Sequence, residues 1–400
     1  MGAAVGRGKG GHDWLTTECS IAYDESEQAN EEAAAMTRFV TAFWLLLACI
    51  AAPNSGSAAD PFWGADPTWS LLHEPAIGQE LKLSPAQSQQ FRTLLDGLDA
   101  KFFPLRNQPR DEGGRQAGAI LQQAFTSLES LLTKAQLRRF AEIQVRLQGT
   151  GALLEDGLAK TMSFTPVQRA QVAKVISETL AATRELEARA RKGEPREPLE
   201  KQYADRKREE LQAVTEILTP AQQSDWRKAL GRDFDMTRLG RPSYKAPEIV
   251  DSGEWLNSEP LTHESLAGNV VVVHFYAFGC INCIHNYPTY LEWHEKFRGK
   301  SVVILGIHTP ETSAEEDSSA VKTKAEGAAF KFPVLIDNEK ANWNAWGNSM
   351  WPSVYLVDKR GYLRYFWPGE LKWNGAAGDK WMAARIEELL AEPDPPKSAD

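Results

Sequence analysis

The stretch "NVVVVHFYAFGCINCIHNYP", residues 269–288, decides the fold of the second half of this chain. Residues 269–278 form a continuous apolar run rich in β-branched side chains, which predicts a strand buried on both faces. Cys280 and Cys283 follow where the pattern changes to that of a helix, which we expect over residues 281–297. The stretch therefore predicts a strand that leads into a helix through two closely spaced thiols.

The segments downstream extend this unit into an α/β domain. "SVVILGIH" (301–308) reads as a second buried strand, so that a strand–helix–strand unit results, with parallel pairing as the default. The rest of the domain is predicted as a helix near 314–329, a strand over 332–337, a hairpin of 353–358 and 362–367 around "KRG", and a helix from Asp379. We place this domain at 254–391 and expect the acidic tail 392–400 to be disordered.

The cysteine pair favours redox chemistry over its rivals. A structural zinc site would need further ligands at suitable spacing, and a c-type haem would need His directly after Cys283, where Ile284 stands. A peroxiredoxin site would need Ser or Thr at the position of Ala277. A structural disulfide stays open, although so short a loop restrains little of the unfolded chain. We expect no metal and no cofactor.

The position of each cysteine indicates its role. Cys280 stands at the predicted helix start, where the first N–H groups and the helix dipole favour a thiolate, the nucleophilic form. Cys283 lies one turn further on and can attack a mixed disulfide to release the product. We therefore predict Cys280 as the nucleophile and Cys283 as the resolving cysteine.

From about 254 to 369 the chain resembles the DipZ-type thioredoxin-like domain, close to the TlpA group. The resemblance rests on 269–288, on "GIHTPE" (306–311), on "DNEKANWNAWGN" (337–348) and on "WPSVYLVDKRGYLRYFWPGE" (351–370). It implies a thioredoxin sheet flanked by helices, a thiol–disulfide oxidoreductase and a Cys280–Cys283 disulfide in the oxidised form. It also implies that Pro352 is the cis-proline beside the cysteines and that Pro288 kinks the active-site helix.

Two further residues are candidates for supporting roles. His274 stands six residues before Cys280, where thioredoxin keeps a buried acid, and we expect either a buried neutral side chain or a proton-transfer group. Trp351 precedes Pro352, and its backbone is a candidate for pairing with an extended substrate segment.

The middle of the chain repeats a short pattern, which reads apolar, Ser or Thr, two residues, Gln. The copies are "LSPAQ" (83–87), "LTKAQ" (132–136), "FTPVQ" (164–168) and "LTPAQ" (218–222). Each is a capping box that predicts a helix start, and turn-formers at 106–114 and 192–198 divide the intervening segments into hairpins.

We predict an all-helical domain over 83–239 with two such units, between linkers at 60–82 and 240–253. The motif resembles the LTxxQ motif of the Spy/CpxP family of periplasmic helical proteins, which implies a role in binding clients or partners. A plain helical spacer is the alternative.

The N-terminal region has the pattern of an export signal. Residues 36–59 combine Arg38, an apolar stretch and the small residues before Asp60, which is typical of a cleaved signal peptide. Residues 1–35 then read as a misassigned extension. Cleavage would leave Cys280 and Cys283 as the chain's remaining cysteines and place the protein in the periplasm; a lipid anchor on Cys49 and an uncleaved signal are the alternatives.

Together these features predict an exported thiol–disulfide oxidoreductase with a helical module for partner or client binding. Its partners would be protein thiols or disulfides, and a separate membrane-bound or periplasmic electron donor would serve it. The net charge of −9 argues against nucleic acid. The alternative is a periplasmic LTxxQ-type chaperone or stress sensor with a thioredoxin-like redox-sensing appendage.

Overall fold

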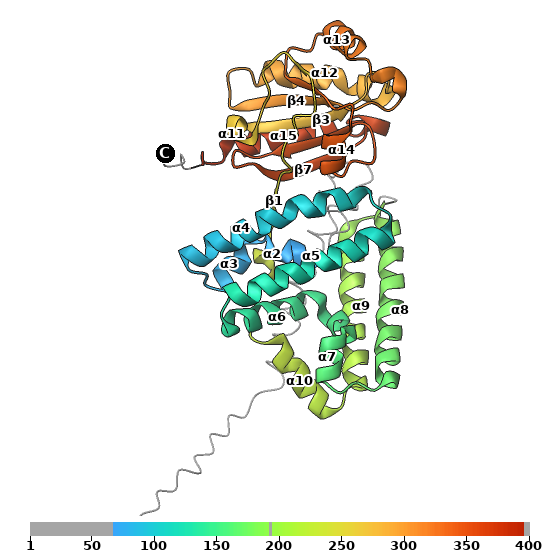
Figure 1. The fold of residues 1–400 in the computed structure, drawn as a ribbon. Coiled ribbons are helices and arrows are strands. Elements are labelled where there is room, and N and C mark those ends of the chain that lie inside the picture. Colours follow the sequence, from blue (N-terminus) through green and yellow to red (C-terminus); the bar gives the residue numbers. More distant parts are fainter. Residues whose placement is uncertain (1–66, 192–193, 396–400) are drawn as a thin grey trace, which may run out of the picture.

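The computed structural model describes residues 67–191 and 194–395, which form a helical region (67–239) followed by a sheet domain (240–395) (Figure 1). The predicted signal segment, Cys19 and Cys49 lie outside the described residues, as does the end of the tail from 396. In the part that is described, no helix is long and apolar enough to cross a bilayer.

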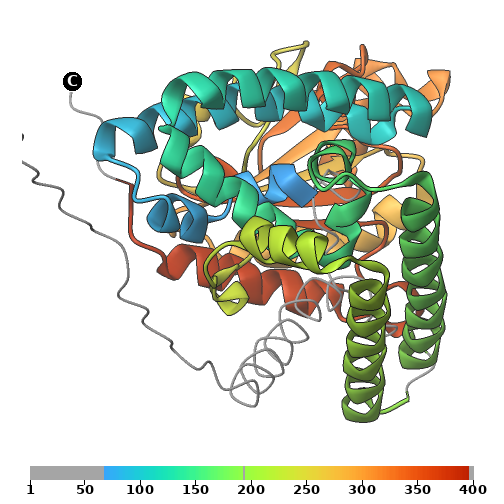
Figure 2. The same cartoon turned by 90° about the horizontal axis from the view of Figure 1, so that it is seen from below.

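The helical region is built from two consecutive units, as the repeated motif predicts. The first contains α2 (Pro67–Leu72), α3 (Pro75–Glu80), α4 (Pro85–Phe102), η1 (Phe103–Asn107), α5 (Arg110–Leu131) and α6 (Lys134–Gln148). The second contains η2 (Gly149–Leu154), α7 (Asp156–Thr161), α8 (Pro166–Arg191), α9 (Arg196–Ile217), α10 (Pro220–Leu230) and η3 (Met236–Arg238). In each unit a long helical hairpin, α4–α5 or α8–α9, leads into a shorter motif helix (Figure 2).

The four motif glutamines do more than cap their own helices. The side chains of Gln87 and Gln136 hydrogen bond to each other at 3.0 Å, and those of Gln168 and Gln222 do so at 2.8 Å. Each amide also donates to a backbone carbonyl just ahead of the partner motif, on Leu131, Leu81, Ile217 and Met162 respectively. The two units therefore share one hydrogen-bond pattern.

The sheet domain holds a mixed sheet of seven strands in the order β1-β7-β6-β3-β4-β5-β2. The strands are β1 (Tyr244–Lys245), β2 (Trp255–Leu256), β3 (Val270–Tyr276), β4 (Val302–His308), β5 (Val334–Ile336), β6 (Ser353–Val357) and β7 (Tyr362–Pro368). β3, β4 and β5 run parallel, and β6 and β7 form the predicted antiparallel hairpin. Every residue of β3 is buried, as the apolar run predicts.

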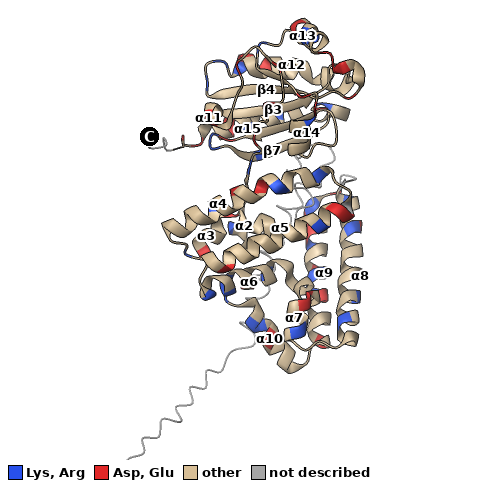
Figure 3. Ribbon diagram, in the orientation of Figure 1, with Lys and Arg blue, Asp and Glu red and all other residues tan. Residues whose placement is uncertain are grey.

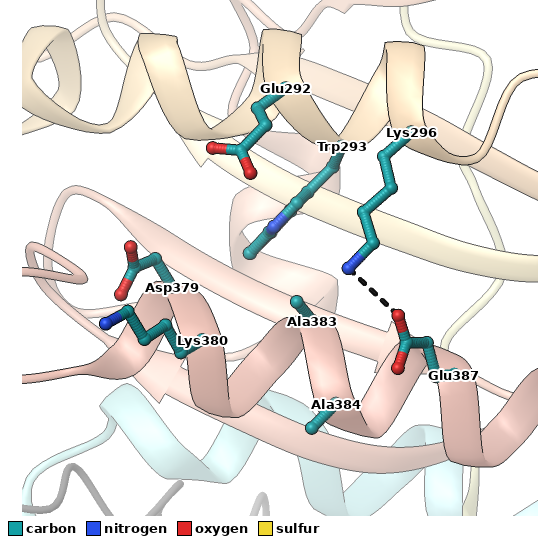
Figure 4. Close-up of a pocket in the computed structure, with 8 residues that line it drawn as sticks. All are labelled: Glu292, Trp293, Lys296, Asp379, Lys380, Ala383, Ala384 and Glu387. Carbon is teal, nitrogen blue, oxygen red and sulfur yellow. Dashed lines mark ion pairs between the residues drawn. The ribbon is translucent and has the colours of Figure 1, made fainter.

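Side chains of β3 alternate between two cores, one on each face of the sheet. Val270 and Val272 face a core shared with α12 (Ile281–Lys296), α13 (Ser318–Gly327) and α15 (Gly378–Ala391). Figure 4 shows α12 and α15 side by side on this face, bridged by an ion pair of 2.9 Å between Lys296 and Glu387. The short elements are α11 (His263–Leu266), η4 (Ser313–Glu315), α14 (Ala341–Ala345) and η5 (Trp373–Gly375).

The opposite face of the sheet is covered by the helical region. Val271 and Val273 belong to a core that continues through α14 into η1 and α4, where Phe102 and Phe103 are buried. Figure 1 shows α4 lying directly beneath the sheet. The two parts of the chain therefore share one apolar core instead of being joined by a free hinge.

Both segments that we predicted as linkers contain regular structure. Residues 67–80 form α2 and α3, and the side chains of Trp69 and Ile77 are fully buried. Residues 240–253 contribute β1, in which Tyr244 pairs with Leu363 of β7. These elements are too short to show a helical or strand period in the sequence, which is why they read as linkers.

A buried carboxylate joins three of these segments. Asp99 of α4 accepts hydrogen bonds from the Trp69 indole at 3.2 Å and from the Lys245 backbone N–H at 2.7 Å. The Nε2 atom of His73 lies 3.0 Å from the same carboxylate. Asp99 thus ties α2 and β1 to α4 at the boundary between the helical region and the sheet domain.

Candidate active site

Cys280 is the N-cap residue of α12, placed there by the turn that follows β3. Its extended backbone and partly exposed side chain leave the sulfur accessible at the helix start. The sulfur accepts a hydrogen bond from the backbone N–H of Cys283 at 3.3 Å. This is the position where unpaired N–H groups and the helix dipole stabilise a thiolate.

Cys283 lies one turn further along α12 and is fully buried. Both thiols are free, so the structure represents the dithiol form. Hydrogen bonding from the Cys283 thiol, together with backbone N–H groups, lowers the pKa of Cys280. Burial, and the bond that its thiol donates to Cys280, raise the pKa of Cys283. The two cysteines therefore differ in both access and acidity.

The cis-proline that the resemblance implies is present. The Trp351–Pro352 peptide bond is cis, directly ahead of β6. Because Ser353 pairs with Phe275 of β3, Pro352 lies at the same end of the sheet as the turn to Cys280, where β3 finishes and β6 begins. The Trp351 ring stacks on Trp343 at 3.9 Å. Pro288 lies inside α12, as expected.

His274 is fully buried in β3 and packs among aromatic rings. Its ring stacks on Tyr290 with centroids 4.0 Å apart. Neither ring nitrogen has a hydrogen-bond partner among the residues that the structure describes. Burial lowers the pKa of His274 to about 3, so the imidazole is neutral near pH 7.

Glu315 lies near the cysteines, and no local pattern predicts its place there. The carboxylate of Glu315 accepts a hydrogen bond of 2.7 Å from the backbone N–H of Gly279, the residue before Cys280. It also accepts the N–H groups of Glu311 and Thr312, at 2.9 Å each. Burial opposes the charge, but these bonds outweigh it and hold the pKa of Glu315 below its usual range. The Thr312–Glu315 spacing is that of a capping box, yet nothing local shows that the carboxylate reaches Gly279.

The start of α12 is also tied to the loop after β7. His285 Nδ1 lies 2.9 Å from the carboxylate of Glu370. The Asn286 side chain accepts the backbone N–H of Leu371 at 2.9 Å. Both contacts join residues far apart in the chain, so no local pattern predicts them.

Two hollows among the described residues lie away from the cysteines. A groove of about 220 Å³ separates α12 from α15 (Figure 4), and a cleft of about 990 Å³ lies between α4 and the sheet domain. Neither is lined by Cys280 or Cys283. Basic and acidic residues are interspersed over the described parts of the chain (Figure 3). The partly exposed sulfur of Cys280 lies outside both hollows.

Comparisons with known proteins concern the sheet domain. The model of the AhpC/TSA family matches residues 242–366. DipZ of Mycobacterium tuberculosis is 33% identical over 132 residues, which are 32% of this chain and 19% of that protein. The thiol-disulfide oxidoreductase YkuV of Bacillus subtilis is 29% identical over 147 residues, 36% of this chain and 94% of YkuV.

Among solved structures, a crystal structure of a thioredoxin-like superfamily protein shares 28% identity with a TM-score of 0.33, covering 38% of this chain and 99% of its own. The present chain thus spans less than a fifth of the DipZ protein, but nearly all of YkuV lies within its match. The C-terminal part of the chain is a thioredoxin-like domain related to thiol–disulfide oxidoreductases, which confirms that expectation.

Proposed function

We propose that this protein is a thiol–disulfide oxidoreductase in which Cys280 attacks and Cys283 resolves. The observation that carries the proposal is the pairing of an accessible sulfur at the start of α12 with a buried thiol one turn on. The lowered pKa of Cys280 favours the nucleophilic thiolate there. The relationship to YkuV supports the same activity.

Reduction of a partner disulfide takes two thiol–disulfide exchange steps. The Cys280 thiolate attacks one sulfur of a partner disulfide, so that a mixed disulfide forms and the partner's other sulfur leaves as a thiolate. The Cys283 thiol gives its proton to the first partner thiolate and attacks the Cys280 sulfur, which releases the second partner sulfur as a thiolate. Two electrons have then passed to the partner, and the Cys280–Cys283 disulfide remains. A separate dithiol donor, membrane-bound or periplasmic, must reduce it, and the reverse sequence oxidises a partner dithiol.

The surroundings of Cys280 favour proteins as partners. Ile281 and Ile284 on α12 are exposed, by 60% and 40%, and Met350 beside Trp351 is exposed by 46%. Large apolar side chains exposed on neighbouring positions of one helix, as Ile281 and Ile284 are, are typical of contact surfaces. Together with the neighbouring Trp351–Pro352 backbone, they would receive an extended segment that carries a thiol or disulfide.

Insulin reduction tests the proposed activity. With dithiothreitol as the reductant, the full chain should accelerate precipitation of the insulin B chain well above the rate of dithiothreitol alone. A variant with both cysteines changed to Ser provides the matched control. A wild-type rate no higher than that of the double variant would refute the proposal.

The helical region has a second candidate role, in binding unfolded clients. Val167 and Leu180 on α8 are exposed by 68% and 53%, which is the observation that favours it. If the protein is instead an LTxxQ-type chaperone or sensor, the double cysteine variant should suppress aggregation of a reduced client as well as wild type does. If neither protein suppresses aggregation of the client at several-fold molar excess, the chaperone role is refuted and the oxidoreductase role alone remains.

Export is proposed from the signal-like segment 36–59. N-terminal sequencing of protein recovered from an exporting host should begin near Asp60. A protein that is blocked, labels with radioactive palmitate and begins at Cys49 would support the lipid anchor instead. A protein that stays in the cytoplasm, begins at Met1 and keeps the signal-like segment would refute export.

A further inference from the structure

The short helix η1 of the helical region binds the loop that leads to the cis peptide bond. Arg106 Nη1 donates to the Trp346 carbonyl and to the Tyr355 hydroxyl, at 3.1 Å each. Its guanidinium also lies over the Phe366 ring, 4.7 Å from the centroid. One arginine of the helical region thus contacts both the 346–352 loop and the sheet beneath it.

A second set of contacts holds the same loop. The Asn107 amide donates to the Asn348 carbonyl at 3.1 Å, and the Tyr355 hydroxyl donates to the Asn348 side chain at 2.7 Å. Gly347 has a φ of +57°, and a Cβ there would lie 2.0 Å from the carbonyl oxygen of Phe103. The backbone of the loop therefore fits against η1 so closely that only glycine is accommodated at 347.

The far end of the loop is held by the sheet domain. The Trp351 indole donates to the Thr309 carbonyl at 3.0 Å, and its ring stacks on Trp343. Pro352 follows and opens β6 beside the cysteine turn. The loop therefore runs from an anchor on the helical region to the part of the site where a substrate segment would pair.

We propose that η1 is a positioning element of the redox site, in which Arg106 and Asn107 hold the 346–352 loop in the conformation that receives the partner chain. This inference rests on the proposed oxidoreductase function. It makes the helical region part of the scaffold of the site, in addition to any surface it offers to clients. Neither residue contacts the cysteines, so their effect should fall on binding of the partner and not on the chemistry of Cys280.

The kinetic test uses the full chain with two substrates, insulin and the small disulfide 5,5′-dithiobis(2-nitrobenzoate). For Arg106→Ala we expect KM for insulin to rise about tenfold with little change in kcat, since each lost hydrogen bond weakens binding of the ordered loop. Reaction with the small disulfide should be unchanged. Arg106→Lys should fall between, because lysine keeps the charge without the planar donor group.

Two further variants control this experiment. Asn107→Ala removes one contact and leaves Arg106 in place, so it tests the loop even if Arg106 variants fold poorly; we expect about a threefold rise in KM. Arg115→Ala on α5 removes an exposed arginine that pairs with Glu112, and should change nothing. Equal losses of kcat on both substrates, with KM unchanged, would show a merely structural role and overturn the proposal.

Hydrogen exchange separates this proposal from the proposed function. In Arg106→Ala the backbone N–H groups of residues 346–351 and of Ser353 should exchange faster, while the N–H groups of α12 keep their wild-type rates. Unchanged exchange in the loop overturns the positioning role whatever the activity. If wild type reduces neither disulfide, the oxidoreductase proposal fails, and the assignment to a redox site fails with it, even where the exchange data show that η1 holds the loop.

Discussion

Replacing Cys283 with Ser should turn the protein into a trap that accumulates mixed disulfides with its partners. The exposed Cys280 still attacks, but the buried thiol that resolves the intermediate is gone. Cys280→Ser should lower exchange activity by about a thousandfold or more, since the nucleophile itself is lost. Trapped species should appear on non-reducing gels and disappear with dithiothreitol. The double variant is the control and should trap nothing.

Alkylation gives an independent check on the same assignment. Because the pKa of Cys280 is lowered and that of Cys283 is raised, there is a pH range in which Cys280 is a thiolate and Cys283 is still a thiol. Iodoacetamide should therefore label Cys280 first, with a rate that rises as the pH passes the lowered pKa. If Cys283 is labelled first, or if Cys280→Ser traps partners as well as Cys283→Ser does, the roles are wrongly assigned.

The largest effect on stability is expected for Asp99→Ala. The substitution leaves the Trp69 indole and the Lys245 N–H without their acceptor and removes the partner of the His73 Nε2 atom. A buried group that loses its hydrogen-bond partner costs about 1–3 kcal/mol, and because several groups lose theirs here we expect about 3–5 kcal/mol in total. Urea unfolding followed by circular dichroism should show this loss in the free energy of unfolding. Because one core spans both parts of the chain, we expect a single unfolding transition whose midpoint lies at a lower urea concentration.

Asp96→Ala is the matched control, three residues earlier on α4. Asp96 is only half-buried and accepts a hydrogen bond of 3.0 Å from the Tyr362 hydroxyl. Its loss should cost about 1 kcal/mol. A double-mutant cycle of His73→Ala with Asp99→Ala should show coupling. Equal losses for the Asp96 and Asp99 variants would mean that the buried network adds nothing beyond an ordinary surface bond.

The contacts of η1 and Asp99 join the helical region to the sheet domain. The repeated motif and the turn-formers predict a module separate from the sheet domain. The structure instead places α4 against one sheet face and Arg106 against the loop before Pro352. A change in the helical region would therefore alter the packing against the sheet and against the loop before Pro352.

Much of the architecture could be read from local patterns alone. The apolar run of 270–276 predicts a buried strand, and the four Ser/Thr-x-x-Gln motifs predict helix starts, because capping and burial are decided by neighbouring residues. The helical region and the thioredoxin-like sheet are both confirmed. The cysteine pair is also visible in the sequence, because two cysteines separated by two residues at a predicted helix start indicate redox chemistry.

The tertiary structure decided what depends on residues far apart in the chain. Glu315 holds Gly279, Gln87 pairs with Gln136, and Asp99 meets Lys245. The local sequence does not show the distant partner of any of these side chains, because that partner is set only when packing brings the segments together. α2, α3 and β1 were missed for a related reason. An element of a few residues is stabilised by the surfaces that it covers, and those surfaces belong to other parts of the fold.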